Sequence, residues 1–80
     1  MRWMKNDYPE LLITIGNNIR KFRKAKGISQ ETLAHLSDID RTYMSYIENA
    51  KFNVSFKKLC DIANVLDVDV TELIGGSIIG

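Results

Sequence analysis

The sequence predicts a compact all-α bundle of five helices, and three observations support this fold class. Apolar residues recur at spacings of three and four along most of the chain, which is the period of an amphipathic helix. Small polar residues that favour helix N-termini precede these segments. The connections between the segments are short, as they are in compact helical domains.

The first helix is expected over about residues 11–26, and Gly27 after a cationic last turn is expected to end it. Its apolar stripe is formed by Leu12, Ile15, Ile19 and Phe22. Ser29 is placed to cap a second helix over 30–37. The residues that this second helix is expected to bury are Leu33, Ala34 and Leu36.

Three further helices follow the same logic. Asp40 is expected to cap a third helix over 41–49, and Ser55 a fourth over 56–66. The buried side of the fourth is predicted to contain Phe56, Leu59, Ile62, Ala63 and Leu66, with Cys60 beside them as a small core hydrophobe. Asp69, with Glu72 three residues later, has the spacing of a capping box and starts a brief fifth helix that ends at the glycines 75–76.

The length of 80 residues allows one domain with a single core. We divide the chain into an N-terminal extension (1–10), the helical domain (11–75) and a tail (76–80). The single cysteine excludes an internal disulfide and fits a reducing compartment. No apolar run approaches the roughly 18 residues of a membrane span, and the N-terminus is too polar for a signal peptide, so the chain is expected to be cytoplasmic with no membrane partner.

The net charge of +1 is unevenly distributed. Residues 1–30 carry seven Lys or Arg against two acids, whereas residues 31–50 carry one against four. The basic charge is concentrated in "RKFRKAK" (20–26), which by itself fits a solvated helix face as well as a polyanion-binding surface.

The two faces of the third helix differ in an informative way. Ile39, Met44 and Ile47 share the side expected to face the core. The opposite side carries short uncharged polar groups with Arg41 at its start, and these residues are weaker helix formers than the Glu and Lys usual on a solvated face. The outward residues are Thr42, Ser45, Tyr46 and Asn49.

Such a face suits the major groove of double-stranded DNA. The groove is about 12 Å wide, its base edges offer donors and acceptors, and an arginine can make two hydrogen bonds to one guanine. In a helix-turn-helix the first helix crosses the backbone and the start of the second reads bases. Residues 30–49 therefore predict a DNA-binding helix-turn-helix.

Residues 15–74 resemble the lambda-repressor-like helix-turn-helix family of phage repressors and Cro. Within them, "DRTYMSYIE" is similar to the controller proteins of restriction-modification systems. The positions that carry the resemblance are Arg23, Gly27, Ser29, Gln30, Leu33, Ala34, Ser45, Ile47, Glu48, Ser55, Leu59, Ala63, Leu66 and Leu73.

The resemblance implies roles for single residues. Base-reading positions correspond to Arg41, Thr42 and Tyr46, and Ser45 faces the same groove. Phosphate-binding positions correspond to Gln30, Tyr43, Asn49 and Lys51. The resemblance also implies a buried ion pair between Arg23 and Glu48.

Several positions depart from the family pattern. Asp38 stands where the turn usually has Gly, although Asp tolerates the left-handed conformation better than most residues. Ala50 replaces a Gly that is common after the recognition helix, so an altered path is expected for the loop that holds Lys51. Val54 stands where Pro is frequent, which is also expected to alter the path of that loop. Asn53 stands where a basic residue is frequent, which suggests that one fewer phosphate is neutralised.

A single module of this kind reads too few bases to be selective, which predicts a homodimer on a palindromic operator. The candidate interface residues are Val68, Val70, Ile74, Ile78 and Ile79, although the tail has the alternative of covering its own core. The predicted function is therefore a sequence-specific transcriptional regulator, an activator or a repressor, with a restriction-modification controller as the narrower interpretation.

The alternative is a protein-interaction module on the same fold, such as an antitoxin. An enzyme is not expected, because no nucleophile elbow, phosphate-binding loop or metal-ligand spacing occurs. No cofactor, metal or small-molecule ligand is predicted.

Overall fold

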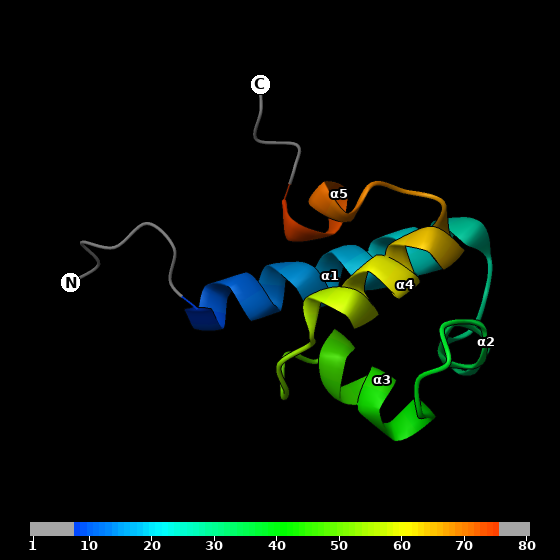
Figure 1. The fold of residues 1–80 in the computed structure, drawn as a ribbon, viewed down its shortest axis with the longest axis horizontal. Coiled ribbons are helices and arrows are strands. Elements are labelled where there is room, and N and C mark those ends of the chain that lie inside the picture. Colours follow the sequence, from blue (N-terminus) through cyan, green and yellow to red (C-terminus); the bar gives the residue numbers. More distant parts are fainter. Residues whose placement is uncertain (1–7, 76–80) are drawn as a thin grey trace.

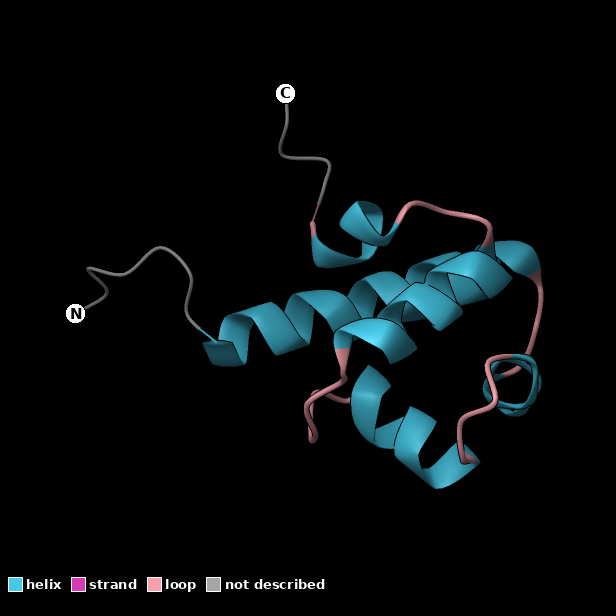
Figure 2. Ribbon diagram, viewed as in Figure 1, coloured by secondary structure: helices cyan, strands magenta, loops and turns pink. Residues whose placement is uncertain are grey.

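The computed structural model describes residues 8–75, which form five helices joined by short loops (Figure 1). The helices are α1 (Tyr8–Lys26), α2 (Gln30–Leu36), α3 (Arg41–Glu48), α4 (Phe56–Leu66) and α5 (Val70–Ile74). No strand occurs in this part of the chain (Figure 2), so the all-α prediction is confirmed.

α1 begins at Tyr8 rather than at Leu11, which corrects the expected start of the first helix. Pro9, which was predicted to lie in the N-terminal extension (1–10), is therefore in the first turn of the helix. A proline fits there because the first turn of a helix leaves its amide hydrogens without intrahelical partners, and the fixed φ of proline is already helical.

α1 runs through the middle of the molecule, and the other helices are arranged around it (Figure 1). It packs against α3, α4 and α5, while α2 packs against α3 and α4. The short helices α2 and α3 thus form one end of the bundle and expose their outer faces together.

The core lies where these helices meet, and it is apolar apart from Glu48 and Ser37, both described below. Met44, Ile47 and Ile39 are buried, as the periodicity predicts. The other buried apolar side chains are Ile15, Ile19, Leu33, Ala34, Leu59, Ile62, Ala63, Leu66 and Leu73.

Two residues predicted to be buried are exposed. Leu36 is 57% exposed and Phe56 is 65% exposed. Leu36 is the last residue of α2 and Phe56 the first of α4, so each has the correct helical phase but lies at an end that the neighbouring helices do not cover. Cys60, expected in the core, is only half-buried.

The predicted N-terminal caps are confirmed. The Ser29 hydroxyl accepts from the Thr32 amide at 3.0 Å, and the Ser55 hydroxyl accepts from the Lys58 amide at 3.1 Å. The Asp40 carboxylate accepts from the first amides of α3, with the shorter bond, from Thr42, at 3.0 Å. These bonds satisfy helix amides that have no backbone partner, so each helix start is fixed by local sequence.

Four of the helices end in the same way, with a left-handed residue followed by an amide that bonds five residues back. The left-handed residues are Gly27 (φ 76°), Asp38 (57°), Ala50 (59°) and Asp67 (61°). The closing amide–carbonyl bonds are Ile28–Arg23, Ile39–Ala34, Lys51–Tyr46 and Val68–Ala63, at 2.8–3.3 Å. This is the Schellman motif, and three of the four examples are built without glycine.

Candidate nucleic-acid interface

The unit formed by α2, the turn 37–40 and α3 has the helix-turn-helix arrangement predicted from the sequence. Asp38 takes the left-handed conformation in the turn, as expected for a residue at a usual glycine position. Ser37 is buried beside it, and its hydroxyl has no hydrogen-bond partner within residues 8–75. The turn therefore forms with the residues present, at some cost in local strain and polar burial.

A close backbone contact sets the position of α3 on α1. Gly16 of α1 is buried, and a Cβ atom at this position would lie 2.5 Å from the carbonyl oxygen of Glu48 and 2.8 Å from that of Ile47. Only a residue without a side chain allows this approach. The C-terminal end of α3 is consequently held at a fixed, short distance from the α1 backbone.

The outer face of α3 and the start of α2 enclose a hollow of about 210 Å³. Gln30 contributes from α2, and the rest of the lining comes from α3. The lining residues are Gln30, Arg41, Thr42, Ser45 and Tyr46, which include every residue predicted to read bases. The structure thus brings these predicted residues together on one concave surface, which we call the reading face.

Two members of the reading face have side chains that are free for a partner. Arg41 and Thr42 are both exposed, and neither side chain forms a hydrogen bond or ion pair with any of residues 8–75. The Thr42 amide, in contrast, is held by the Asp40 carboxylate. The backbone at the start of α3 is therefore fixed while its side chains remain available.

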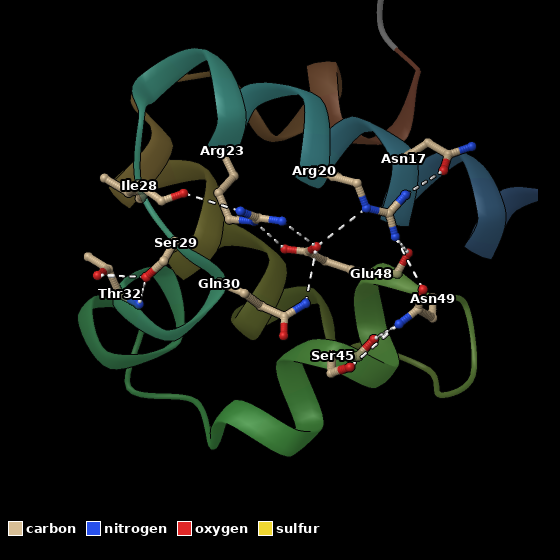
Figure 3. A network of polar contacts seen from close by, with 10 residues as sticks. All are labelled: Asn17, Arg20, Arg23, Ile28, Ser29, Gln30, Thr32, Ser45, Glu48 and Asn49. Carbon is tan, nitrogen blue, oxygen red and sulfur yellow. Dashed lines mark hydrogen bonds and ion pairs between the residues drawn. The ribbon is translucent and has the colours of Figure 1, made fainter.

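Beside Gln30 lies the buried carboxylate of Glu48 (Figure 3). Arg23 of α1 donates from Nε at 2.8 Å to one carboxylate oxygen and from Nη2 at 3.1 Å to the other. The Glu48 side chain is fully buried, and that of Arg23 is 12% exposed. The structure thus confirms the ion pair that the family resemblance implies, and its two-bond geometry is the strong form of such a pair.

The same carboxylate also holds Gln30 of α2, whose Nε2 donates to Oε1 at 3.2 Å. Gln30 was predicted to bind phosphate, and its second amide hydrogen and its carbonyl oxygen remain available for that. Glu48 therefore ties α1, α2 and α3 together at one point (Figure 3).

Arg20 is a second arginine in this network that sequence reasoning missed. Its Nη2 donates to the Glu48 backbone carbonyl at 2.8 Å, and its Nε lies 3.6 Å from the carboxylate. The signal was present in the sequence, because Arg20 and Arg23 are three residues apart and share one face of α1.

Asn49, predicted to bind phosphate, is the C-cap of α3 and is exposed. Its Nδ2 donates to the Ser45 carbonyl at 2.9 Å, and its Oδ1 accepts from Arg20 at 3.3 Å. The amide is therefore held in one orientation from both sides. Lys51, two residues later, has an exposed side chain, and its amide closes the end of α3 on the Tyr46 carbonyl.

Tyr43 uses its hydroxyl inside the protein. The half-buried side chain donates a hydrogen bond of 2.7 Å to the Asn53 carbonyl in the loop after α3. A tyrosine has one hydroxyl hydrogen, so donation to a phosphate, the role predicted for Tyr43, requires this bond to be given up.

Three of the predicted dimer residues lie in α5 or just before it, and α5 is on the opposite side of α1 from α3 (Figure 1). Val68, Val70 and Ile74 are half-buried and pack against the core around α5. Ile78 and Ile79 fall outside the described residues. Between residues 8 and 75, no helix has the length and apolarity to cross a bilayer, and no group of three potential metal-ligating side chains occurs.

Comparison with known proteins adds independent information. The helix-turn-helix family model matches residues 19–73. Control protein C.MunI from Mycoplasma sp is 45% identical over 65 residues, which cover 80% of this chain and 88% of that protein.

Solved structures of similar proteins agree with the sequence match. The restriction-modification controller protein C.AhdI from Aeromonas hydrophila has a TM-score of 0.75 at 44% identity, over 78% of this chain and 94% of that chain. A hypothetical transcription factor from Neisseria has a TM-score of 0.79 at 35% identity, over 85% of this chain and 78% of that chain. The chain therefore belongs to the helix-turn-helix family of DNA-binding transcription regulators, in which restriction-modification controller proteins are among its relatives.

Proposed function

We propose that the protein regulates transcription by binding a two-fold symmetric DNA operator as a homodimer, with α3 of each protomer in the major groove. The observation that carries this proposal is the reading face, where Arg41, Thr42, Ser45 and Tyr46 line one hollow together with Gln30. A surface of short donors and acceptors beside one free guanidinium matches the pattern of base edges.

Each reading residue has a distinct chemical task in this proposal. The free Arg41 guanidinium is suited to two hydrogen bonds to O6 and N7 of one guanine. The Thr42 and Ser45 hydroxyls donate or accept at neighbouring bases, and the Thr42 methyl fits the thymine methyl. Gln30, Asn49 and Lys51 flank these residues and are proposed to set the register by contacting phosphates. Tyr43 would join them only by exchanging its hydrogen bond to the Asn53 carbonyl for one to a phosphate.

The dimer follows from the amount of information that one module can read. A single reading face with one arginine contributes one strong base contact, worth about 1–3 kcal/mol of discrimination. Two copies about 34 Å apart double the contacts on successive turns of DNA. We place the interface at α5 and the tail, through Val68, Val70, Ile74, Ile78 and Ile79.

The similarity to C.MunI and C.AhdI supports a narrower proposal, namely that this chain is itself a controller of restriction-modification genes. Both relatives match over most of their own length, so no additional domain of theirs is needed to explain the similarity.

Selection of binding sites from a random pool of double-stranded DNA with the purified protein tests the proposal directly. We expect a palindromic consensus whose half-sites are about one helical turn apart. Light scattering at several protein concentrations is expected to give the mass of a dimer. Failure to enrich any sequence would contradict the reading function, and a concentration-independent monomer mass would contradict the dimer.

Variants of Arg41 separate base reading from charge. Arg41→Ala is expected to abolish the preference at one base pair of each half-site, at a cost of about 1–3 kcal/mol. Arg41→Lys keeps the charge but loses the paired donors, so it should lose the same preference with a smaller loss of affinity. Lys57→Ala, which removes an exposed positive charge from α4, is the control and should leave the preference intact.

Salt dependence tests the proposed phosphate contact of Lys51. Because each neutralised phosphate releases counterions, Lys51→Ala is expected to reduce the slope of log K against log salt by about one per protomer. Its affinity should fall by the same factor on every sequence. A change confined to one base position would instead assign Lys51 to base reading.

A further inference from the structure

The loop after α3 places an aromatic ring against the reading face. Phe52 is 53% exposed, yet its ring packs against two tyrosines of α3. It meets Tyr46 nearly edge-on, with centroids 5.0 Å apart and ring planes at 69°, and it meets Tyr43 at 6.1 Å and 55°. The first of these contacts has the edge-to-face geometry that aromatic pairs prefer.

The backbone directs Phe52 to this position. Ala50 turns the chain back with a φ of 59°, and the Lys51 amide closes the turn on the Tyr46 carbonyl at 2.8 Å. The Tyr43 hydroxyl then holds the next carbonyl after Phe52, that of Asn53, at 2.7 Å. Hydrogen bonds on both sides of Phe52 therefore fix the backbone in a position that places its ring against α3.

The two tyrosines depend on Phe52 to different degrees. Tyr43 has its hydrogen bond to Asn53 and would keep its orientation without Phe52. Tyr46 lines the reading face, is 40% exposed, and its hydroxyl forms no hydrogen bond with any residue in the described range. The contact with Phe52 is consequently the one aromatic or hydrogen-bond interaction that the Tyr46 side chain makes among residues 8–75.

We propose that Phe52 is a positioning residue that holds Tyr46 in the orientation in which it contacts DNA bases. This inference rests on the proposed reading function. An exposed tyrosine samples several rotamers, and fixing one of them on binding costs free energy. The contact with Phe52 already fixes one Tyr46 rotamer in the free protein, so this free-energy cost does not reduce the affinity for DNA.

The experiment uses Phe52→Ala and, as a matched control, Phe56→Ala. Phe56 is a phenylalanine of similar exposure, 65%, and its ring packs against no other aromatic ring among residues 8–75. Each purified variant is titrated against the selected operator and against operators changed at one base pair. Phe56→Ala should leave the melting temperature almost unchanged, whereas Phe52→Ala should lower it by about 4–8 °C because two aromatic contacts are lost, so both variants are compared at a temperature where both are folded.

We expect Phe52→Ala to weaken operator binding by about three- to tenfold per protomer, while Phe56→Ala has no effect. The loss should appear as reduced discrimination at the base pair whose preference Tyr46→Ala also removes. Phe52→Tyr, which keeps an aromatic edge at this position, should restore binding.

A double-variant cycle distinguishes positioning from direct contact. If Phe52 acts through Tyr46, then Phe52→Ala should cause no further loss in a Tyr46→Ala background. An equal loss in that background, or an equal loss on every sequence, would overturn the inference by showing that Phe52 touches DNA or supports the loop. Unchanged binding by Phe52→Ala would overturn it too. If the unmodified protein selects no sequence, it is instead the proposed function that fails.

Discussion

Glu48 is the residue on which three helices depend. Its buried carboxylate accepts hydrogen bonds from Arg23 of α1 and Gln30 of α2, while the residue itself ends α3. A buried carboxylate is costly unless each oxygen has a partner, and both oxygens have one here. The bundle therefore gains a fixed geometry at this point rather than a large surplus of stability.

Removal of one partner of this pair should be severe. Glu48→Ala leaves the Arg23 guanidinium buried without a carboxylate, which is expected to lower the free energy of unfolding by about 3–5 kcal/mol. Chemical denaturation followed by circular dichroism measures this change. A loss below about 1 kcal/mol would show that solvent reaches Arg23 and replaces its partner.

The double variant Arg23→Leu with Glu48→Leu provides the matched test. Because an apolar pair avoids burying charge, most of the lost stability should return, as it does when other buried ion pairs are replaced. Gln30 would still lack its acceptor. We therefore expect a stable protein with weaker DNA binding, whereas full binding would show that Gln30 needs no support.

At the scale of elements, the backbones of α1 and α3 come into close contact at Gly16, beside the side-chain ion pair of Arg23 and Glu48. Gly16→Ala gains about 1 kcal/mol of helix propensity, but the new Cβ would lie 2.5 Å from the Glu48 carbonyl oxygen. Backbone must move to relieve this clash, at a typical cost of about 1–3 kcal/mol. We expect a lower melting temperature and weaker DNA binding. The adjacent exposed variant Asn17→Ala should change the melting temperature little.

The left-handed ends of the helices offer a stabilising change. Ala50 holds a φ of 59°, where a Cβ costs about 1–2 kcal/mol, so Ala50→Gly should raise the free energy of unfolding by about 0.5–1 kcal/mol after the added freedom of the unfolded chain is subtracted. The same substitution at Ala25, an exposed residue in the last turn of α1, should instead destabilise by up to about 1 kcal/mol. Chemical denaturation measures the change in the free energy of unfolding for both variants. A lower free energy of unfolding for Ala50→Gly would contradict the proposed strain.

The sequence predicted the elements whose cause is local. The caps at Ser29, Asp40 and Ser55 depend on residues two or three positions away, and all three are confirmed. The predicted burial of Leu36 and Phe56 was wrong, because the helical period fixes the direction of a side chain but not how far the neighbouring helix extends.

Contacts that join distant segments were harder to predict. The buried pair of Glu48 came only from family resemblance, and its link to Arg20 was missed because 28 residues separate the two. The packing of Phe52 on Tyr46 depends on the left-handed turn at Ala50, where the sequence suggested an altered loop path. The turn closes with alanine in place of glycine, as the hydrogen bond from the Lys51 amide to the Tyr46 carbonyl shows.

At the scale of the whole molecule, the proposed dimer depends on a very short helix. α5 has five residues and could not persist alone. Leu73 anchors it in the core, and the Asn18 side chain of α1 donates to the Leu73 carbonyl at 2.9 Å. Half-buried Asn18 therefore sets the orientation in which α5 presents Val70 and Ile74.

Two adjacent asparagines test this dependence. Asn18→Ala should loosen α5 and raise the dimer dissociation constant by about fivefold, the effect of one ordinary hydrogen bond. Asn17→Ala, whose side chain contacts Arg20 on the other side of α1, should leave dimerisation unchanged. Sedimentation equilibrium measures both constants. Equal behaviour of the two variants would place the interface away from α5.

The freedom of Arg41 and Thr42 has a consequence for how new DNA preferences arise. Neither side chain supports the fold within residues 8–75, since α3 is held through its inner face, its cap and the backbone contact at Gly16. Substitutions at these two positions are consequently free of the stability threshold that constrains most changes in a small protein. A duplicated copy of this gene could therefore diverge in operator preference by exchanging two side chains while keeping the same scaffold.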